Sequence, residues 1–365
     1  MKKILIYVDS MNPSGGIERV IANLSNQWVK HFNIVLLVKD NKKSFYSLDK
    51  NVEYRTLNCP LKINYLNRLL RGFGFLKSIF QSHYKLKRFL KKEKPNFIYT
   101  SSIINSLEVL MQGSQYSQRL IISEHGSFYG YNSIYMKLKK YVYPRAYKLS
   151  VPTTMDTEIY LKCGYPAVYI PHLSTFTSVG KRSELKNRIV LNVGRLTSDK
   201  QQLKLLQIWK KVSEKNNGFD WILQIVGKGE EEANLKNYVN KNNMNNNVEF
   251  VKPTENIGHY FNNASIFAFT SRNEGFGMVL LEAMSFGVPC ISFDCPSGPR
   301  DLITCENGFL IENNNTVEFV EKLQLLIKKY ELRENMGQKA YEKAKNWDND
   351  SIVQAWIDLF EVNYD

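Results

Sequence analysis

Apolar residues in this chain recur in short, nearly continuous runs that are separated by segments with helical spacing. In the first half these runs lie at 3–10, 33–40, 96–102, 119–125, 148–154 and 167–172. A second series lies at 189–195, 221–227, 248–252, 265–271, 289–294 and 308–311. Strands that are buried on both faces of a parallel sheet have this continuous pattern. The alternation predicts an α/β fold with two doubly wound, Rossmann-like domains.

Changes in polarity along the chain predict where these domains begin and end. Residues 176–188 are polar and have no periodic apolar face, which is typical of a linker. We therefore expect an N-terminal domain at 1–175 and a C-terminal domain at 189–345, a division that suits a chain of 365 residues. A helical pattern breaks around Trp347, and we expect residues 346–365 to form a helix that packs back on the first domain.

Composition excludes several classes of protein. The chain is 43% apolar and 23% charged, as an ordinary globular protein is. Its five cysteines have no metal-ligand spacing, so we expect a reducing compartment, no metal and no cofactor. The N-terminal run contains Asp9 and is expected to be a strand rather than a signal peptide, and no run is long enough to span a bilayer. We therefore expect a cytoplasmic location.

The positive charge is concentrated in the first half of the chain. Residues 1–180 hold 26 Lys and Arg against 10 Asp and Glu, whereas residues 181–365 hold 23 against 25. The segment 62–94 contributes ten basic residues and one acidic residue, and the cluster at 135–148 interleaves lysines with tyrosines. A solvated helix face is one interpretation, but the lack of balancing acids favours an anionic membrane surface. The candidate acceptor and membrane residues are Arg68, Arg71, Lys77, Lys85, Lys87 and Arg88.

The loops after the strands of the second half carry the candidate chemistry. Residues 275–277 form a Gly-Phe-Gly turn before an apolar helix, and such a helix start offers free N–H groups to a phosphate. Arg195 and Lys200 lie five residues apart in another loop and would clamp a diphosphate. Glu282 would accept hydrogen bonds from vicinal hydroxyls, as in a ribose, and Glu274 would face the group at the other end. Two acids that flank a diphosphate suit a nucleotide sugar.

Other motifs have simpler interpretations when they are taken alone. His125 ends a predicted strand, where a single histidine is usually structural. Residues 348–350, Asp-Asn-Asp, follow Trp347 at a helix break and are better explained by capping than by a metal.

Taken together, the motifs resemble a known family. They are GGIERV at 15–20, NVGRLTSDK at 192–200, VGKGEEEANL at 226–235, the segment 269–303 around Glu274 and Glu282, and NGFLI at 307–311. Their order and spacing are similar to those of the retaining glycosyltransferases of family 4, which have the GT-B fold. The resemblance is strongest to the bacterial enzymes that assemble lipid-linked surface polysaccharides and glycans. It implies two domains that face each other across a cleft.

The resemblance also implies roles for individual residues. Glu282 would bind the ribose, Glu274 the donor sugar, and Arg195 with Lys200 the diphosphate. His125 would hydrogen-bond the donor sugar, which favours a site role over a structural one. The sequence departs from the family at His172, where asparagine is common, and that position has no assigned role. The candidate catalytic residues are Glu274, His125, Arg195 and Lys200, and the candidate donor-binding residues are Gly15, Gly16, Gly194, Arg195, Lys200, Gly227, Phe250, Val251, Glu274, Gly275, Phe276, Gly277, Met278, Val279 and Glu282.

These residues predict transfer of a sugar from a nucleotide sugar, with UDP as the expected nucleotide, to a glycan on polyprenyl diphosphate. Cations and amides would stabilise the leaving group without a metal. Same-face attack and a covalent intermediate on Glu274 are both open.

Two other functions are alternatives to sugar transfer. A sugar-nucleotide epimerase of the same fold would use similar parts, and a nucleic-acid binder would explain the basic half but not the paired glutamates.

Overall fold

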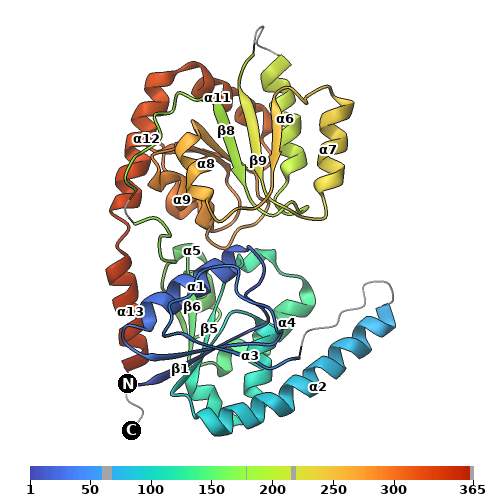
Figure 1. Ribbon diagram of the computed structural model, residues 1–365, viewed down its shortest axis with the longest axis vertical. Coiled ribbons are helices and arrows are strands. Elements are labelled where there is room, and N and C mark those ends of the chain that lie inside the picture. The colour runs from blue at the N-terminus through green and yellow to red at the C-terminus, as the bar shows by residue number, and fades with distance from the viewer. Residues whose placement is uncertain (60–67, 178, 215–218, 362–365) are drawn as a thin grey trace. The chain divides into compact units, whose positions relative to one another are not determined.

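The computed structural model describes residues 1–365 except 60–67, 178, 215–218 and 362–365, and it does not describe the side chains of 68–80. The chain divides into two compact units (Figure 1). Unit 1 consists of Met1–Leu173 together with Asp350–Asp365, and unit 2 consists of Ser174–Asn349. Each unit is described by itself below.

Unit 1 contains a parallel sheet of seven strands among the described residues, in the order β3-β2-β1-β4-β5-β6-β7. The register pairs Ile4 of β1 with Ile34 of β2 on one side and with Phe97 of β4 on the other. Strand order therefore reverses between β1 and β4. The strands are β1 (Lys3–Val8), β2 (Asn33–Val38), β3 (Glu53–Thr56), β4 (Phe97–Thr100), β5 (Leu120–Ser123), β6 (Lys148–Val151) and β7 (Ala167–Tyr169).

Helices bury both faces of this sheet because successive strand residues point to opposite sides. Leu5 and Tyr7 of β1 belong to the same buried cluster as Leu86 and Leu90 of α2. On the other face, Tyr99 of β4 packs on aromatic residues of α1 and α13. The helices of unit 1 are α1 (Gly16–Trp28), α2 (Arg68–Glu93), α3 (Ile103–Leu110), α4 (Ser133–Val142), α5 (Thr154–Lys162) and α13 (Asn349–Glu361), with 3-10 turns η1 (Ser114–Arg119), η2 (Phe128–Gly130) and η3 (Tyr143–Arg145).

Unit 2 contains six described strands in the order β10-β9-β8-β11-β12-β13, all parallel, and the order reverses between β8 and β11. Helices again cover both faces, with Trp209 of α6 in the cluster on one face and Phe261 of α8 against Phe267 on the other. The strands are β8 (Ile189–Val193), β9 (Ile222–Val226), β10 (Val248–Val251), β11 (Ile266–Phe269), β12 (Cys290–Phe293) and β13 (Gly308–Ile311). The helices are α6 (Gln202–Glu214), α7 (Glu232–Lys241), α8 (Ile257–Asn263), α9 (Met278–Ser285), α10 (Gly298–Leu302), α11 (Thr316–Lys328) and α12 (Tyr330–Lys345).

The segment that the polarity pattern marks as a linker, 176–188, lies in unit 2. Phe176 packs edge-on against Phe286, with 4.9 Å between the ring centroids, and Leu185 is buried. These two apolar residues are too far apart in sequence to give a periodic signal. Strand β3 was not predicted either, because its sequence Glu-Tyr-Arg-Thr is polar and largely exposed at the sheet edge.

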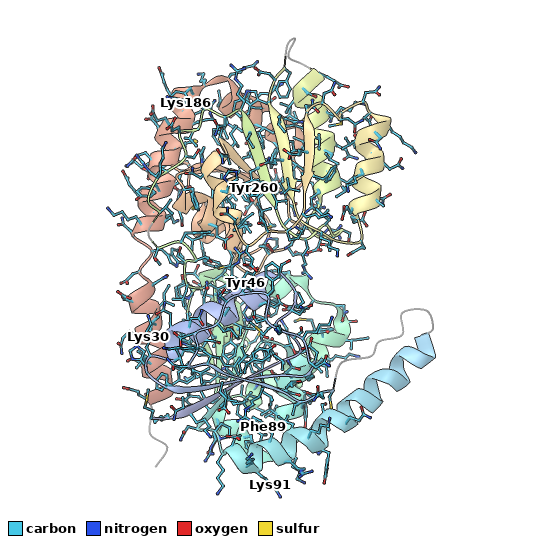
Figure 2. The ribbon with its side chains drawn as sticks, viewed as in Figure 1. Lys30, Tyr46, Phe89, Lys91, Lys186 and Tyr260 are labelled. Atoms are coloured by element: carbon cyan, nitrogen blue, oxygen red, sulfur yellow. The ribbon has the colours of Figure 1, made fainter. Side chains whose placement is uncertain are left out.

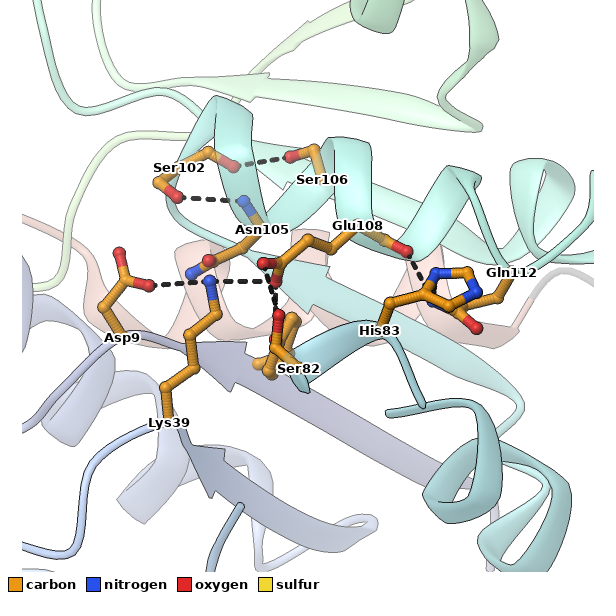
Figure 3. Close-up of polar contacts among 10 residues, drawn as sticks. Asp9, Lys39, Ser82, His83, Ser102, Asn105, Ser106, Glu108 and Gln112 are labelled. Carbon is orange, nitrogen blue, oxygen red and sulfur yellow. Dashed lines mark hydrogen bonds and ion pairs between the residues drawn. The ribbon is translucent and has the colours of Figure 1, made fainter. Parts of the chain in front are cut away.

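An ionic cluster with a buried lysine and a buried glutamate lies at the carboxyl edge of the unit 1 sheet (Figure 3). Lys39, directly after β2, has its ammonium 2.8 Å from Glu108 of α3 and 3.0 Å from Asp9, directly after β1. Glu108 also accepts hydrogen bonds from Tyr7 and from Ser82 of α2. Because an isolated buried charge is costly, this paired arrangement ties α2 and α3 to the ends of β1 and β2.

Helix α13 belongs to unit 1 although it is the last helix in the chain (Figure 1). Trp356 packs against Trp28 of α1 with 4.9 Å between ring centroids, and Phe360 packs against Phe97 at 5.5 Å. Lys2 donates hydrogen bonds to the carbonyl oxygens of Phe360 and Glu361 and so satisfies the end of the helix.

Replacing Trp356 with alanine is expected to lower the free energy of unfolding of unit 1 by about 3–5 kcal/mol, because a fully buried indole is removed. Urea denaturation followed by circular dichroism measures the change. Gln354→Ala, on the exposed side of the same helix, is the control and should change stability by about 0.5 kcal/mol or less. Equal effects of the two substitutions would show that α13 does not contribute to the core.

Candidate functional site

The predicted donor-binding loops of unit 2 meet at the carboxyl edge of its sheet, where strand order reverses between β8 and β11. Ligands of doubly wound folds bind at such a reversal. Residues 194–201 follow β8, residues 227–231 follow β9 and residues 270–277 follow β11. Thr270 donates hydrogen bonds to the carbonyl oxygens of Lys200 and Gln201, so the loops after β8 and β11 are directly joined.

Lys200 and Glu274 form the central contact of this edge. The Lys200 ammonium donates to both carboxylate oxygens of Glu274, at 2.9 and 2.7 Å. Their side chains are 17% and 16% exposed, so the pair is shielded but reachable from solvent. Burial lowers the pKa of Lys200, but the charge and hydrogen bonds of Glu274, together with the charge of Asp199, raise that pKa above its ordinary value. Lys200 therefore stays charged at neutral pH.

Arg195, the second predicted cation, is exposed in the same loop. Its carbonyl oxygen accepts a hydrogen bond from the Gln202 side chain at 2.9 Å, which fixes the loop backbone. The Arg195 charge opposes the rise of the Lys200 pKa, as a smaller effect than burial or Glu274. An anion with two charges would relieve the repulsion between the two cations.

Glycine permits the loops after β8 and β9 to approach each other. A Cβ atom on Gly227 would lie 1.9 Å from the Gly194 carbonyl oxygen, and one on Gly229 would lie 2.1 Å from the Leu196 carbonyl oxygen. The backbone N–H of Gly194 donates to Val226, and that of Gly227 donates to Val251 at the end of β10. Gly227 therefore has a packing role, whereas a Cβ atom on Gly194 would meet nothing closer than 3.9 Å. The contact of either glycine with the donor stays a prediction.

The Gly-Phe-Gly turn leads into α9 as predicted, with the helix beginning at Met278. Gly277 caps the helix with φ +86, a left-handed conformation that favours glycine. The side chains of Phe276 and Met278 are buried, and Phe276 packs on Trp347 at 5.6 Å between ring centroids. Gly275 and Gly277 are buried as well and Val279 is half-buried, so the predicted contact of this turn with a phosphate stays a prediction.

Glu282 lies in the second half of α9 and its side chain has no solvent exposure. Its Oε1 atom accepts a hydrogen bond from the hydroxyl of Thr175 at 3.1 Å. The sequence alone gives no sign of this partner, because Thr175 precedes the segment interpreted as a linker. Glu282 thus takes no part in the Lys200–Glu274 contact, and its carboxylate binds the hydroxyl group of Thr175. Phe250 and Val251, the last two residues of β10, are half-buried.

The predicted catalytic and donor-binding residues of unit 1 are Gly15, Gly16 and His125. Gly15 and Gly16 begin α1, and Gly16 is exposed. His125 follows β5, and its ring stacks on that of His172 with 5.2 Å between centroids. Burial lowers the pKa of His125 to about 4 against a smaller opposing effect of Glu124, so the imidazole is neutral at pH 7.

The basic residues of α2 are only partly described. The side chains of Arg68, Arg71 and Lys77 lie outside the described residues. Lys87 and Arg88 are exposed, whereas Lys85 donates to the carbonyl oxygens of Leu57 and Asn58. In Figure 2, Phe89 and Lys91 are labelled on this helix; Phe89 packs against the core of unit 1, and Lys91 is exposed.

The cluster at 135–148 differs from the expectation that no acid balances its cations. Lys139 is buried and pairs with Glu124 at 2.6 Å, so it does not belong to an exposed basic face.

Within the described part of the chain, no group of three His, Cys, Asp or Glu residues is placed to hold a metal ion. None of the described helices is both long and apolar enough to cross a membrane.

Comparison with known proteins assigns the chain to a family. Residues 176–343 match the family model "Glycosyl transferases group 1". The chain is 30% identical over 372 residues to the amylovoran biosynthesis glycosyltransferase AmsD of Erwinia amylovora, a match that covers 98% of this chain and 99% of that protein. The chain belongs to the group 1 glycosyltransferases.

Solved glycosyltransferases share the fold of this group 1 glycosyltransferase. TarM of S. aureus superimposes with a TM-score of 0.84 over 99% of this chain and 100% of that chain, at 16% identity. Sucrose-phosphate synthase from Thermosynechococcus elongatus superimposes with a TM-score of 0.82 over 99% of this chain and 98% of that chain, also at 16% identity. The predicted GT-B fold, with two parallel-sheet α/β domains, is confirmed.

The loop after β12 supports the Glu274 turn of this glycosyltransferase, and the sequence analysis did not assign it a role. The Gly298 N–H donates to the Glu274 carbonyl oxygen at 3.4 Å. Ser297 is buried with φ +82, an uncommon conformation for a residue with a side chain. A Cβ atom on Gly298 would lie 2.2 Å from the Phe276 carbonyl oxygen.

Gly298→Ala is therefore expected to lower the free energy of unfolding of unit 2 by about 1–3 kcal/mol, because the new methyl group overlaps the Phe276 backbone. Guanidinium denaturation followed by tryptophan fluorescence measures the change. Gly180→Ala is the matched control, since a Cβ atom there meets nothing within 4 Å. If both variants keep wild-type stability, the two loops do not pack as described.

Proposed function

We propose that this group 1 glycosyltransferase is a retaining enzyme of family 4 that transfers a sugar from a UDP-sugar to a glycan carried on polyprenyl diphosphate. The reaction would contribute to a bacterial surface polysaccharide or glycan. The observation that carries the proposal is the contact between Lys200 and Glu274 beside the start of α9, because it joins a shielded cation to an acid at the sheet edge where such folds bind ligands.

The diphosphate would be held by Lys200, Arg195 and the backbone amides around Gly277. Lys200 is already paired with Glu274, so a diphosphate must take over its ammonium. This exchange replaces one anion by another of higher charge and leaves the Glu274 carboxylate available to accept hydrogen bonds from the donor sugar. Backbone N–H groups at a helix start and two cations then share the charge that develops on the leaving group.

The two ends of the donor would be recognised by hydroxyl-binding groups. Glu282 accepts a hydrogen bond from the Thr175 hydroxyl, which occupies the position that we assign to a ribose hydroxyl. His125 would contact the transferred sugar as a neutral imidazole, able to donate at one nitrogen and accept at the other. Gly16 would lie against the diphosphate, and Phe250 with Val251 against the base.

The same residues suggest how the reaction proceeds. Arg195, Lys200 and the amides near Gly277 provide positive charge for the leaving diphosphate, so the chemistry requires no metal. We favour same-face attack, in which a leaving phosphate oxygen takes the acceptor proton and the anomeric configuration is retained. In this scheme the Glu274 carboxylate, once the diphosphate has taken over the Lys200 ammonium, accepts hydrogen bonds from the donor sugar and is not the nucleophile.

Relatives of the chain motivate the acceptor class. A protein of Campylobacter jejuni, 25% identical over 98% of both chains, is named for adding N-acetylgalactosamine to a glycan on diphosphate-linked undecaprenol. TarM was solved in complex with UDP. A lipid-linked acceptor would bring the enzyme to the inner face of the cytoplasmic membrane as a peripheral protein. Exposed Ile134 and Tyr141 on α4, together with Lys137 and Lys140, provide the apolar and basic groups that such a surface attracts.

Lys200→Met is expected to weaken UDP binding by about ten- to a hundredfold, because charge-assisted hydrogen bonds to the diphosphate are lost. Glu274→Gln should leave UDP binding unchanged or tighter, since Lys200 is released, but should abolish transfer from the UDP-sugar. Isothermal titration calorimetry measures binding, and mass spectrometry with a polyprenyl-diphosphate glycan measures transfer.

The control pair is Lys339→Met and Glu342→Gln, which removes an exposed ion pair of 3.1 Å elsewhere in unit 2. Both controls should bind UDP normally. The donor site is wrong if the Lys200 variant also binds UDP normally. Donor turnover without any acceptor would instead indicate an epimerase.

The enzyme should float with vesicles that contain anionic phospholipid at low ionic strength and should be released by salt. Charge reversal at Lys87 and Arg88, exposed on α2, should reduce the bound fraction, because each cation near an anionic surface contributes about 1 kcal/mol. Reversal at the exposed neighbours Lys328 and Lys329 in unit 2 makes the same charge change and should have little effect. Equal losses for both pairs would indicate a response to net charge rather than a membrane face on unit 1.

A further inference from the structure

Glu124, the residue before His125, lies at the centre of an unusually complete hydrogen-bond network. It follows β5 directly, its side chain is 3% exposed, and its own N–H donates to Ser150 of β6. Its carboxylate accepts six hydrogen bonds from groups in the described part of the chain. The donors are the N–H groups of His125 and Gly126, the hydroxyls of Tyr131, Tyr143 and Tyr160, and the ammonium of Lys139.

The two carboxylate oxygens serve different parts of unit 1. Oε1 accepts from the N–H groups of His125 at 3.0 Å and Gly126 at 3.1 Å and from the Tyr131 hydroxyl at 2.5 Å, so it holds the turn after β5. Oε2 accepts from Lys139 at 2.6 Å, Tyr143 at 2.6 Å and Tyr160 at 2.7 Å, so it holds the core. The carboxylate is a rigid link between the core and the turn that carries His125.

The network keeps this link ionised in spite of its burial. Burial alone would raise the pKa of Glu124, but Lys139 and the surrounding donors lower it to about 2. Lys139 is itself held over the Tyr131 ring, with its ammonium 3.2 Å from the ring centroid. An ionised carboxylate accepts stronger hydrogen bonds from backbone N–H groups than a neutral group does.

The turn is also closed by packing. A Cβ atom on Gly126 would lie 2.3 Å from the Tyr131 hydroxyl oxygen, so only glycine permits the turn to fold onto the tyrosine. His172 stacks on the His125 ring, and the Tyr99 hydroxyl lies 3.4 Å from His125 Nε2. The His125 ring is therefore in contact on one face and at one nitrogen, and its backbone is fixed by Glu124.

We propose that Glu124 is a positioning residue for sugar transfer, which fixes the His125 turn through Oε1 while Oε2 anchors it to the buried Lys139. This inference rests on the proposed function, in which His125 contacts the donor sugar. A residue that positions a sugar-binding group should affect turnover more than UDP binding, because UDP lacks the sugar. A misplacement of about 1 Å can reduce rate about a hundredfold.

Two double variants isolate the Oε1 contacts. Glu124→Gln with Lys139→Met keeps an acceptor oxygen for the turn. The second substitution removes the Lys139 ammonium, because this donor would otherwise face the NH2 group of the new amide, which is also a donor. Glu124→Met with Lys139→Met has a similar volume and the same charge but no acceptor. The first should keep kcat/KM within about threefold of wild type, and the second should lose about a hundredfold in kcat with UDP affinity unchanged.

A matched pair of tyrosine variants distinguishes a loss of positioning from a loss of folding. Tyr131→Phe removes a donor from Oε1, and Tyr160→Phe removes a donor from Oε2, so each deletes one hydroxyl from the same carboxylate. Tyr131→Phe should lower kcat about tenfold and shift the His125 ring resonances in 15N NMR. Tyr160→Phe should lower thermal stability and leave both kcat and those resonances near wild type.

The outcomes separate the inference from the proposed function. His125→Ala tests the latter, since transfer at the wild-type rate in that variant would remove the role of His125 itself. If His125→Ala is inactive but the two double variants lose equal activity, Glu124 acts through stability alone and the positioning role is overturned. Equal effects of the two tyrosine variants on kcat and on the His125 resonances would overturn it as well.

Discussion

Burial of both faces of each sheet is the constraint on which the rest of this structure depends. Strands such as β1 and β4 pack on helices from both sides, so their interiors offer no place for a charge. Polar side chains therefore gather where the strands end. Among the ion pairs that the described residues form at these ends are those of Lys39 with Glu108, Lys139 with Glu124 and Lys200 with Glu274.

These three pairs differ in exposure, and the difference separates scaffold from site. The pairs of Glu108 and Glu124 are at most 3% exposed and are completed by hydroxyl groups, so no ligand can replace either partner without leaving a buried charge. The pair of Lys200 and Glu274 is more exposed. An exchange of partners there costs less, since solvent and an incoming anion can compensate both charges.

The sequence was sufficient for properties that repeat along the chain and insufficient for those that depend on single distant contacts. Continuous apolar runs predicted the parallel sheets, and the Gly-Phe-Gly turn predicted the start of α9. In contrast, Thr175 meets Glu282 from more than a hundred positions away. No local pattern indicates such a contact. The order of motifs brought Lys200 and Glu274 into one hypothesis, although their spacing alone gives no reason to expect a direct ion pair.

The surroundings of His125 in the structure are better evidence for its role than its position in the sequence. Alone, it has the pattern of a structural histidine after a strand, and in the structure it is half-buried. Yet burial is also what keeps the imidazole neutral and oriented. The Glu124 carboxylate directly before it would favour a protonated ring, but its charge is already satisfied by Lys139 and three tyrosine hydroxyls. Because Lys139 and the tyrosine hydroxyls compensate the charge of the ionised Glu124, this carboxylate can hold the backbone of His125 without charging the ring.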